Sequence, residues 1–207
     1  MDLILKYFPS LTSRQEEQFR ALLPFYTDWN SKINLISRKD MEHFYERHVL
    51  HSMGIARYLS FRPKTTIMDV GTGGGFPGIP LAILAPEADF LLTDSIGKKI
   101  MVVNQAVQEL GLTNVTAISR RAEEIKHPFD FIISRAVTNL PEFLTWTQKN
   151  IRRHGSNQKP NGILYLKGGD VGPELDSLPK KLVKIAQPLS QYFSEPWFES
   201  KYLIHLY

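Results

Sequence analysis

A glycine-rich segment, residues 69–78, has the residue types and spacing in this sequence that are best suited to bind a ligand. It reads Asp-Val-Gly-Thr-Gly-Gly-Gly-Phe-Pro-Gly, after the apolar residues 66–68 and before the helix-like residues 79–84. Glycine lets a backbone approach a ligand where a Cβ would collide. Free N–H groups at a helix start, aided by the helix dipole, attract anions and polar groups. The segment therefore predicts a binding loop between a strand and a helix.

The glycine spacing fits more than one cofactor. Gly73-x-Gly75-x-x-Gly78 satisfies the dinucleotide pattern, and Asp94 lies near the spacing of an acid that binds ribose. Read from the strand end, however, the glycines at 71, 73 and 75 follow a carboxylate at position 69. That register resembles the first motif of class I S-adenosylmethionine methyltransferases, in which the loop lies against the methionine part of the cofactor. The whole pattern favours S-adenosyl-L-methionine over NAD, and a structural turn without a ligand is the third interpretation.

Length and composition narrow the chemistry further. The chain has 207 residues, 43% of them hydrophobic and none of them cysteine, with a formal net charge of +4. This length suits one domain with an appendage. Without cysteine there is no disulfide, Cys zinc site or iron–sulfur cluster, nor the cysteine nucleophile of pyrimidine C5 methylation; we predict no metal site. No apolar run approaches the roughly 18 residues that cross a bilayer, so we expect a cytoplasmic protein without membrane contact.

The basic residues come in clusters, and the location of two of these clusters suggests a substrate. Any single pair is best explained as solvated surface. Two pairs, however, fall where the ligand edge of the sheet is expected, which favours a polyanionic substrate. The clusters are Arg38-Lys39, Lys98-Lys99, Arg120-Arg121, Arg152-Arg153-His154 and Lys180-Lys181, and the two at the ligand edge are Lys98-Lys99 and Arg120-Arg121.

The elements that must position these residues follow from hydrophobic periodicity. Residues 12–60 have helical spacing, with a capping box expected at Ser13-x-x-Glu16, a kink at Pro24 and a second helix starting near Asp40. From Lys64 onward, strands and helices alternate, which predicts a mainly parallel sheet covered on both faces. The expected strands are 65–70, 90–93, 115–119, 129–134, 162–167, 182–186 and 202–207, and the expected helices are 80–85, 97–110, 140–150 and 173–178. We therefore predict an α/β fold with an N-terminal helical extension (1–63) and a Rossmann-like methyltransferase domain (64–207).

Residues that end successive strands of such a sheet are the site candidates, because ligands bind at the carboxyl edge. Asp94, after the second strand, can accept hydrogen bonds from both ribose hydroxyls, although it could also cap the following helix. Residues 121–124, after the third strand, occupy the usual place for contacts to adenine. Arg135 follows the fourth strand and replaces the Asn/Asp-Pro-Pro-aromatic stretch of methyltransferases that act on exocyclic amines. This disfavours an amino acceptor and leaves guanine N7 attractive, since its lone pair needs no deprotonation and a guanidinium can pair with guanine O6 or with phosphate.

Nearly the whole chain resembles the bacterial ribosomal small-subunit RNA methyltransferase G family, also called glucose-inhibited division protein B. The motifs that carry this resemblance are Trp29-Asn30-x-x-Ile33-Asn34-Leu35, Arg47-His48-x-Leu50-x-Ser52, the glycine loop through Leu81, Asp94-Ser95-x-x-Lys98-Lys99, Glu123-Glu124, Ser134-Arg135-Ala136 and Leu166-Lys167-Gly168. The resemblance implies methyl transfer from S-adenosyl-L-methionine to N7 of a guanosine in a loop of 16S rRNA, as naked RNA or in a small-subunit particle.

The resemblance also assigns residues to the site. It places the cofactor on Gly71, Phe76, Ala122, Glu123 and Arg135, in addition to Gly73, Gly75 and Asp94 from the loop and acid pattern. We expect RNA contacts from Arg47, His48, Lys98, Lys99, Arg120 and Arg121, with Arg135 also the candidate residue for catalysis by positioning, and we expect a monomer. His48 is either a site residue or a helix histidine, and His51 stands where the family often has an aspartate.

Three other functions remain open on sequence grounds. One is a methyltransferase of a small molecule or a protein, which would not need the basic clusters. Another is an NAD(P)-dependent oxidoreductase, although no Tyr-x-x-x-Lys pair occurs in the chain. The last is an RNA-binding module without activity, although its glycine loop and Asp94 are intact.

Overall fold

Seven strands form one sheet whose order places the glycine loop at its centre. The computed structural model describes residues 1–33 and 35–207, so Asn34 of the Trp29–Leu35 motif lies outside the described residues. The order is β3-β2-β1-β4-β5-β7-β6, in which β7 pairs antiparallel with β5 and β6 and the other neighbouring pairs are parallel. The strands are β1 (Thr66–Val70), β2 (Asp89–Asp94), β3 (Val115–Ser119), β4 (Phe131–Arg135), β5 (Gly162–Gly168), β6 (Lys184–Pro188) and β7 (Lys201–Leu206). The predicted seven-stranded, mainly parallel sheet is confirmed.

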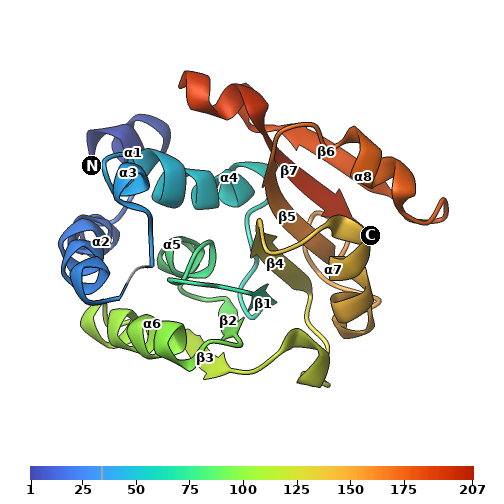
Figure 1. The fold of residues 1–207 in the computed structure, drawn as a ribbon, viewed down its shortest axis with the longest axis horizontal. Coiled ribbons are helices and arrows are strands. Elements are labelled where there is room, and N and C mark those ends of the chain that lie inside the picture. The colour runs from blue at the N-terminus through green and yellow to red at the C-terminus, as the bar shows by residue number, and fades with distance from the viewer. Residues whose placement is uncertain (34) are drawn as a thin grey trace.

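Helices cover both faces of the sheet (Figure 1). One face carries α1 (Asp2–Tyr7), α2 (Ser13–Lys32), α4 (His51–Tyr58), α5 (Gly78–Leu84) and α6 (Gly97–Glu109), and the other carries α7 (Leu140–Thr147) and α8 (Gly172–Ser177). Each face has its own cluster of buried apolar side chains, as expected for strands with helices on both sides. All the strands and helices predicted after Lys64 are present, with ends shifted by a few residues at most.

The N-terminal helices differ in detail from the prediction. The capping box of α2 is formed by Thr12 and Gln15, one residue earlier than predicted, because the Thr12 hydroxyl accepts the Gln15 N–H while the Gln15 amide accepts the Thr12 N–H. Pro24 lies inside α2, which continues past it; the kink stays a prediction. The helical stretch predicted to start near Asp40 begins with the short α3 (Arg38–Met41). It then contains a π-helical segment, Tyr45–Leu50, that hydrophobic spacing did not predict.

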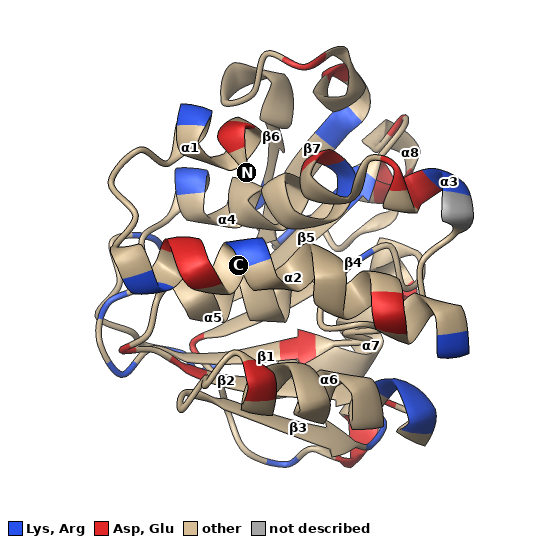
Figure 2. Ribbon diagram, turned by 90° about the vertical axis from the view of Figure 1, so that its left-hand side faces the viewer, with Lys and Arg blue, Asp and Glu red and all other residues tan. Residues whose placement is uncertain are grey.

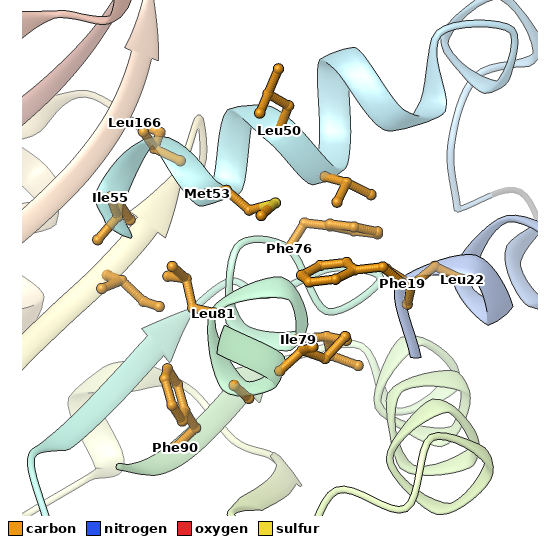
Figure 3. Packing of buried hydrophobic residues seen from close by; sticks show 14 of the residues in the cluster. Phe19, Leu22, Leu50, Met53, Ile55, Phe76, Ile79, Leu81, Phe90 and Leu166 are labelled. Carbon is orange, nitrogen blue, oxygen red and sulfur yellow. The ribbon is translucent and has the colours of Figure 1, made fainter. Parts of the chain in front are cut away.

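The N-terminal helices and the sheet share one core. Figure 3 shows Phe19 of α2 and Met53 of α4 lying close to Phe76 and Ile79, which flank the start of α5. These side chains belong to a single cluster of buried apolar residues that also includes Leu166 of β5. The division into residues 1–63 and 64–207 stays a prediction. Across the part of the chain that the structure describes, no helix combines the length and apolar character needed to cross a membrane.

Candidate ligand-binding site

A cavity of about 480 Å³ lies at the carboxyl ends of β1, β2 and β4. Its walls are the glycine loop, the end of β2, residues 120–123 and 135–137, and three residues of the N-terminal segment, Leu35, Ile36 and His48. This size is typical of a site for a small organic ligand. The position at the point where the strand order reverses, between β1 and β4, is where open α/β sheets bind ligands.

The glycine loop presents its backbone to the cavity. Gly73 has φ +59°, and a Cβ built on it meets no atom closer than the Gly71 carbonyl oxygen, 4.0 Å away. A side chain at this position would therefore enter the cavity rather than the protein. Tyr26 of α2 supports the loop from behind, because its buried hydroxyl donates a hydrogen bond to the Gly74 carbonyl. The loop is therefore held in place from outside the sheet.

Asp94 ends β2 and lies in the cavity wall, largely buried. Its Oδ2 accepts the Gly73 N–H at 3.0 Å, and its Oδ1 accepts the Ile96 N–H at 2.9 Å. The alternative prediction, that Asp94 caps α6, is wrong, because Ile96 is the residue at the N-cap position. An ionised carboxylate has about four lone-pair sites. Two therefore remain for ligand hydroxyls, as ribose binding would require.

Asp69, at the end of β1, is fully buried behind the loop. Its Oδ2 accepts the Thr72 hydroxyl at 2.6 Å and the Gly78 N–H at 2.9 Å, which ties the loop to the start of α5. Its Oδ1 has no partner among the described residues. Burial raises the pKa of this carboxyl to about 7, against the opposing effect of the two hydrogen bonds and the charge of Arg135.

Arg135 ends β4 and brings a positive charge into the cavity wall. Its Nη1 donates to the Arg47 carbonyl at 3.1 Å, its Nη2 lies 2.9 Å from His48 Nδ1, and its guanidinium lies 5.4 Å from the centre of the Phe76 ring. Burial lowers the pKa of this group to about 10, so it remains charged at neutral pH. The next residue, Ala136, has φ +50°, a strained conformation of the kind that gathers at functional sites.

The structure brings most of the predicted residues to this cavity. Gly71, Gly73, Phe76, Asp94, Ala122, Glu123 and Arg135 line it, together with His48, Lys99, Arg120 and Arg121, whereas Gly75 lies behind the loop against Ile79 and Tyr26. Lys98 is exposed beside Lys99 in the first turn of α6, which is blue in Figure 2. Arg47 contributes its carbonyl to Arg135, while its side chain pairs with Asp40 at 3.1 Å.

His51, at the position of the family's aspartate, lies outside the cavity lining. It is buried, with its ring 5.0 Å from Trp197 in an edge-on contact. Burial and the charge of Arg135 hold its pKa well below its usual range, so the ring is neutral. We infer no direct ligand contact for His51.

Sequence reasoning missed several residues of the site. Tyr26 belongs to an apolar helical stripe, which is typical of a core residue, and only its hydroxyl, which must find a partner when buried, hints at another role. Leu35, Ile36 and Trp146 line the cavity from segments far from any strand end. Nothing in their local sequence indicates this, because the tertiary packing of the N-terminal segment and α7 places them there.

The residues present suit S-adenosyl-L-methionine. Gly73 leaves room for close approach of a ligand, and Asp94 keeps lone pairs for ribose hydroxyls. Arg135 supplies a positive charge with no carboxylate within salt-bridge distance among the described residues, which suits an anionic group such as the methionine carboxylate. The antiparallel β7 between β5 and β6 also differs from the six-stranded order typical of NAD-binding sheets.

A family model and the curated relatives of this chain point to the same protein family. A family model described as rRNA small subunit methyltransferase G matches residues 15–192. The curated protein "Ribosomal RNA small subunit methyltransferase G" of Flavobacterium johnsoniae is 53% identical over 206 residues, covering 100% of this chain and 97% of that protein. The protein of the same name from Bacteroides thetaiotaomicron is 52% identical, covering 99% of this chain and 98% of that protein.

Solved structures support the fold. A SAM-dependent methyltransferase from Aquifex aeolicus superimposes with a TM-score of 0.58 at 14% identity, covering 83% of this chain and 98% of that chain. A putative rRNA methylase from Clostridium thermocellum superimposes with a TM-score of 0.53 at 16% identity, covering 77% of this chain and 95% of that chain. At these identities the likeness concerns architecture alone, and it identifies the class I methyltransferase fold.

Proposed function

This chain belongs to the rRNA small subunit methyltransferase G family, and from that premise we propose that it methylates N7 of a guanosine in a loop of 16S rRNA. The observation that carries the proposal is the cavity, which joins an open glycine loop, a carboxylate with free lone pairs and a guanidinium at one edge of the sheet. The alignments with these two curated relatives cover 99–100% of this chain and 97–98% of the relatives.

S-adenosyl-L-methionine, when bound, supplies an electrophilic methyl group on a sulfonium sulfur. Asp94 would hold the ribose, and Ala122 and Glu123 would lie beside the adenine. Gly73 would allow the close approach of the methionine part, with Gly71 beside it in the cavity wall. Phe76 packs against Tyr26, with ring centroids 5.0 Å apart, and so connects this site to the N-terminal helices. These roles rest on the position of each residue in the cavity wall.

The weak basicity of the imidazole in the cavity wall supports guanine N7 as the proposed acceptor. The imidazole in its wall, His48, receives a hydrogen bond from Arg135, and burial together with that charge lowers the pKa of His48 to about 3. A group with so low a pKa is a poor general base at neutral pH. Guanine N7 needs none, since its lone pair is already available, so the contribution of the protein is to position the base. Arg135 would orient the nucleotide through guanine O6 or a phosphate.

The RNA would bind to basic side chains around the opening of the cavity. Arg120 and Arg121 are exposed beside the cavity, and Lys98 and Lys99 stand at the start of α6. Such clusters bind phosphates without reading sequence. We also propose that the protein acts as a monomer, which sedimentation at assay concentration would check. Its rRNA substrate supports a cytoplasmic location.

The experiment that tests this function is mass spectrometry of nucleosides from 16S rRNA. RNA from cells that lack the protein should have less 7-methylguanosine, and expression of the wild-type chain should restore it. Expression of the Arg135→Ala variant at the same level should not. Unchanged 7-methylguanosine would overturn the proposal, and methylation of a protein or small molecule by the purified enzyme would support that alternative instead.

A further inference from the structure

Three buried or half-buried histidines differ in how their ring nitrogens are used. His205 has two partners, the Tyr58 hydroxyl at 3.0 Å and the Pro160 carbonyl at 3.1 Å, and so acts as a structural link. His51 is buried against Trp197 outside the cavity lining. Only His48 both lines the cavity and contacts a charged residue there, since its Nδ1 lies 2.9 Å from Arg135 Nη2.

The contact with Arg135 fixes the protonation of His48. A guanidinium has five donors and no acceptor, and it does not lose its proton in proteins. Nδ1 of His48 must therefore be the acceptor. In the neutral ring the single hydrogen then resides on Nε2. Burial and the charges of Arg135 and Arg47 oppose the protonation of His48, whereas the charge of Asp40 favours it, and together they lower its pKa to about 3. His48 is thus a neutral acceptor with one defined tautomer.

The same contact fixes Arg135. Its two terminal nitrogens donate to two acceptors on the π-helical segment Tyr45–Leu50, the Arg47 carbonyl and His48 Nδ1. The Phe76 ring lies beside the guanidinium, 5.4 Å from its carbon. Two hydrogen bonds from separate nitrogens determine the plane of a guanidinium, and the remaining N–H groups stay available to a ligand. The orientation of Arg135 therefore depends on the N-terminal segment and not only on β4.

We propose that His48 is a positioning residue that orients Arg135 while leaving its positive charge uncompensated. An aspartate or glutamate in its place could hold the guanidinium equally well, but it would neutralise the charge and compete with the anionic group of the ligand. A neutral acceptor holds the group without that competition. The inference rests on the proposed function only in naming that ligand as the cofactor or the guanosine.

Substitutions at His48 separate these effects. His48→Asn keeps a neutral acceptor close to the position of Nδ1, His48→Leu removes the acceptor, and His48→Asp keeps an acceptor but adds a negative charge. We expect His48→Asn to bind S-adenosyl-L-methionine within about threefold of wild type in calorimetry, with the other two at least tenfold weaker. His43→Asn is the matched control, because His43 is a nearby, more exposed histidine outside the cavity lining.

A spectroscopic readout on the wild-type protein needs neither RNA nor a variant. Nitrogen-15 NMR of labelled histidine should show His48 with an unprotonated Nδ1 and a protonated Nε2, unchanged from pH 8 to pH 5. A protonated Nδ1, or an Asn variant as weak as the Leu variant, would overturn the proposal. A protein that has this tautomer and this order of affinities but does not methylate rRNA would support the positioning role and refute the proposed function.

Discussion

Two buried aspartates lie at opposite edges of the sheet and have opposite surroundings. Asp130, at the amino end of β4, accepts hydrogen bonds from the Thr66 N–H and hydroxyl and from Asn161, and it pairs with Arg152 at 3.1 Å. Asp69, at the carboxyl end of β1, has one oxygen without a partner among the described residues and no ion pair within 4.0 Å there.

Two arginines, Arg152 and Arg135, differ between the two edges in the same way as the aspartates. Arg152 at the amino edge is matched to a carboxylate, whereas Arg135 at the carboxyl edge donates only to neutral acceptors. Buried polar groups normally have partners, and unsatisfied ones are costly. The comparison teaches that Asp130 and Arg152 at the amino edge pair with each other, whereas Asp69 and Arg135 at the carboxyl edge have no ion pair among the described residues.

The largest expected effect concerns pH and Asp69. The pKa of Asp69 is about 7 in the folded protein, against 3.8 in the unfolded chain. Between these pH values the folded state therefore holds a proton that the unfolded state has lost. Its contribution to stability is complete below the unfolded pKa and is lost as pH rises from about 4 to 7. In Asp69→Asn, which cannot titrate at this position, the free energy of unfolding should fall by up to about 4 kcal/mol less over this pH range than in the wild-type protein. Urea unfolding at a series of pH values measures it, and parallel curves for the two proteins would contradict the raised pKa.

Exchange of each arginine for alanine tests the two edges directly. Arg135→Ala should lower the rate of methyl transfer at least about a hundredfold, close to 3 kcal/mol, with a small change in stability. Arg152→Ala should leave the rate within about twofold but lower the free energy of unfolding by about 1–2 kcal/mol, because Asp130 loses a charged partner. Single-turnover assays and urea unfolding of both variants provide the measurements. Equal loss of activity in both would remove the distinction between the edges.

Two glycines with positive φ offer a matched test of the loop. Gly73 has φ +59° and Gly169 has φ +81°. A Cβ built on either residue would lie at least 4.0 Å from the surrounding atoms. Alanine should strain both to a similar extent, by about 1–2 kcal/mol. Only Gly73→Ala should also weaken S-adenosyl-L-methionine in calorimetry, by about 2 kcal/mol, since its methyl group would occupy the cavity. Unchanged affinity would mean that the ligand does not approach Gly73.

Asp94→Ala should have a smaller effect on the same affinity. The carboxylate would lose its bonds to the ribose hydroxyls, at a cost of about 1–2 kcal/mol, while the N–H groups of Gly73 and Ile96 would become available to water. Calorimetry with S-adenosyl-L-methionine and with methionine alone separates the two contributions, since only the nucleoside part should be affected. An equal loss for methionine would indicate a collapsed loop.

The smallest effect concerns RNA. Exchange of Lys98 and Lys99 for glutamine should lessen the slope of log affinity against log salt by about 0.7 for each phosphate that these lysines neutralise. The same exchange at Lys180 and Lys181, exposed before β6 at the amino edge, should leave the slope unchanged. Filter binding to a 16S rRNA fragment over a range of salt measures this. A similar change in both variants would make the clusters ordinary solvated surface.

Much of the fold could be predicted because alternating strands and helices have strong local signals. The glycine loop, Asp94 and Arg135 were found because each ends a strand, and parallel strands end at one edge. The π-helical segment Tyr45–Leu50 could not be predicted in this way, because no hydrophobic period distinguishes it from an α-helix. The contacts of Tyr26 with Gly74 and of His48 with Arg135 join residues 48 and 87 positions apart, and only packing creates them.

Backbone NMR during a titration with S-adenosyl-L-methionine tests the central claim most directly. If the carboxyl edge binds the ligand and the amino edge serves the fold, amide shifts should concentrate at Gly71–Phe76, Asp94–Ile96 and Ala122–Glu123. The amides of Thr66, Arg152 and Asn161 should stay within experimental error. Shifts centred on these three, or no saturable change at all, would contradict the account.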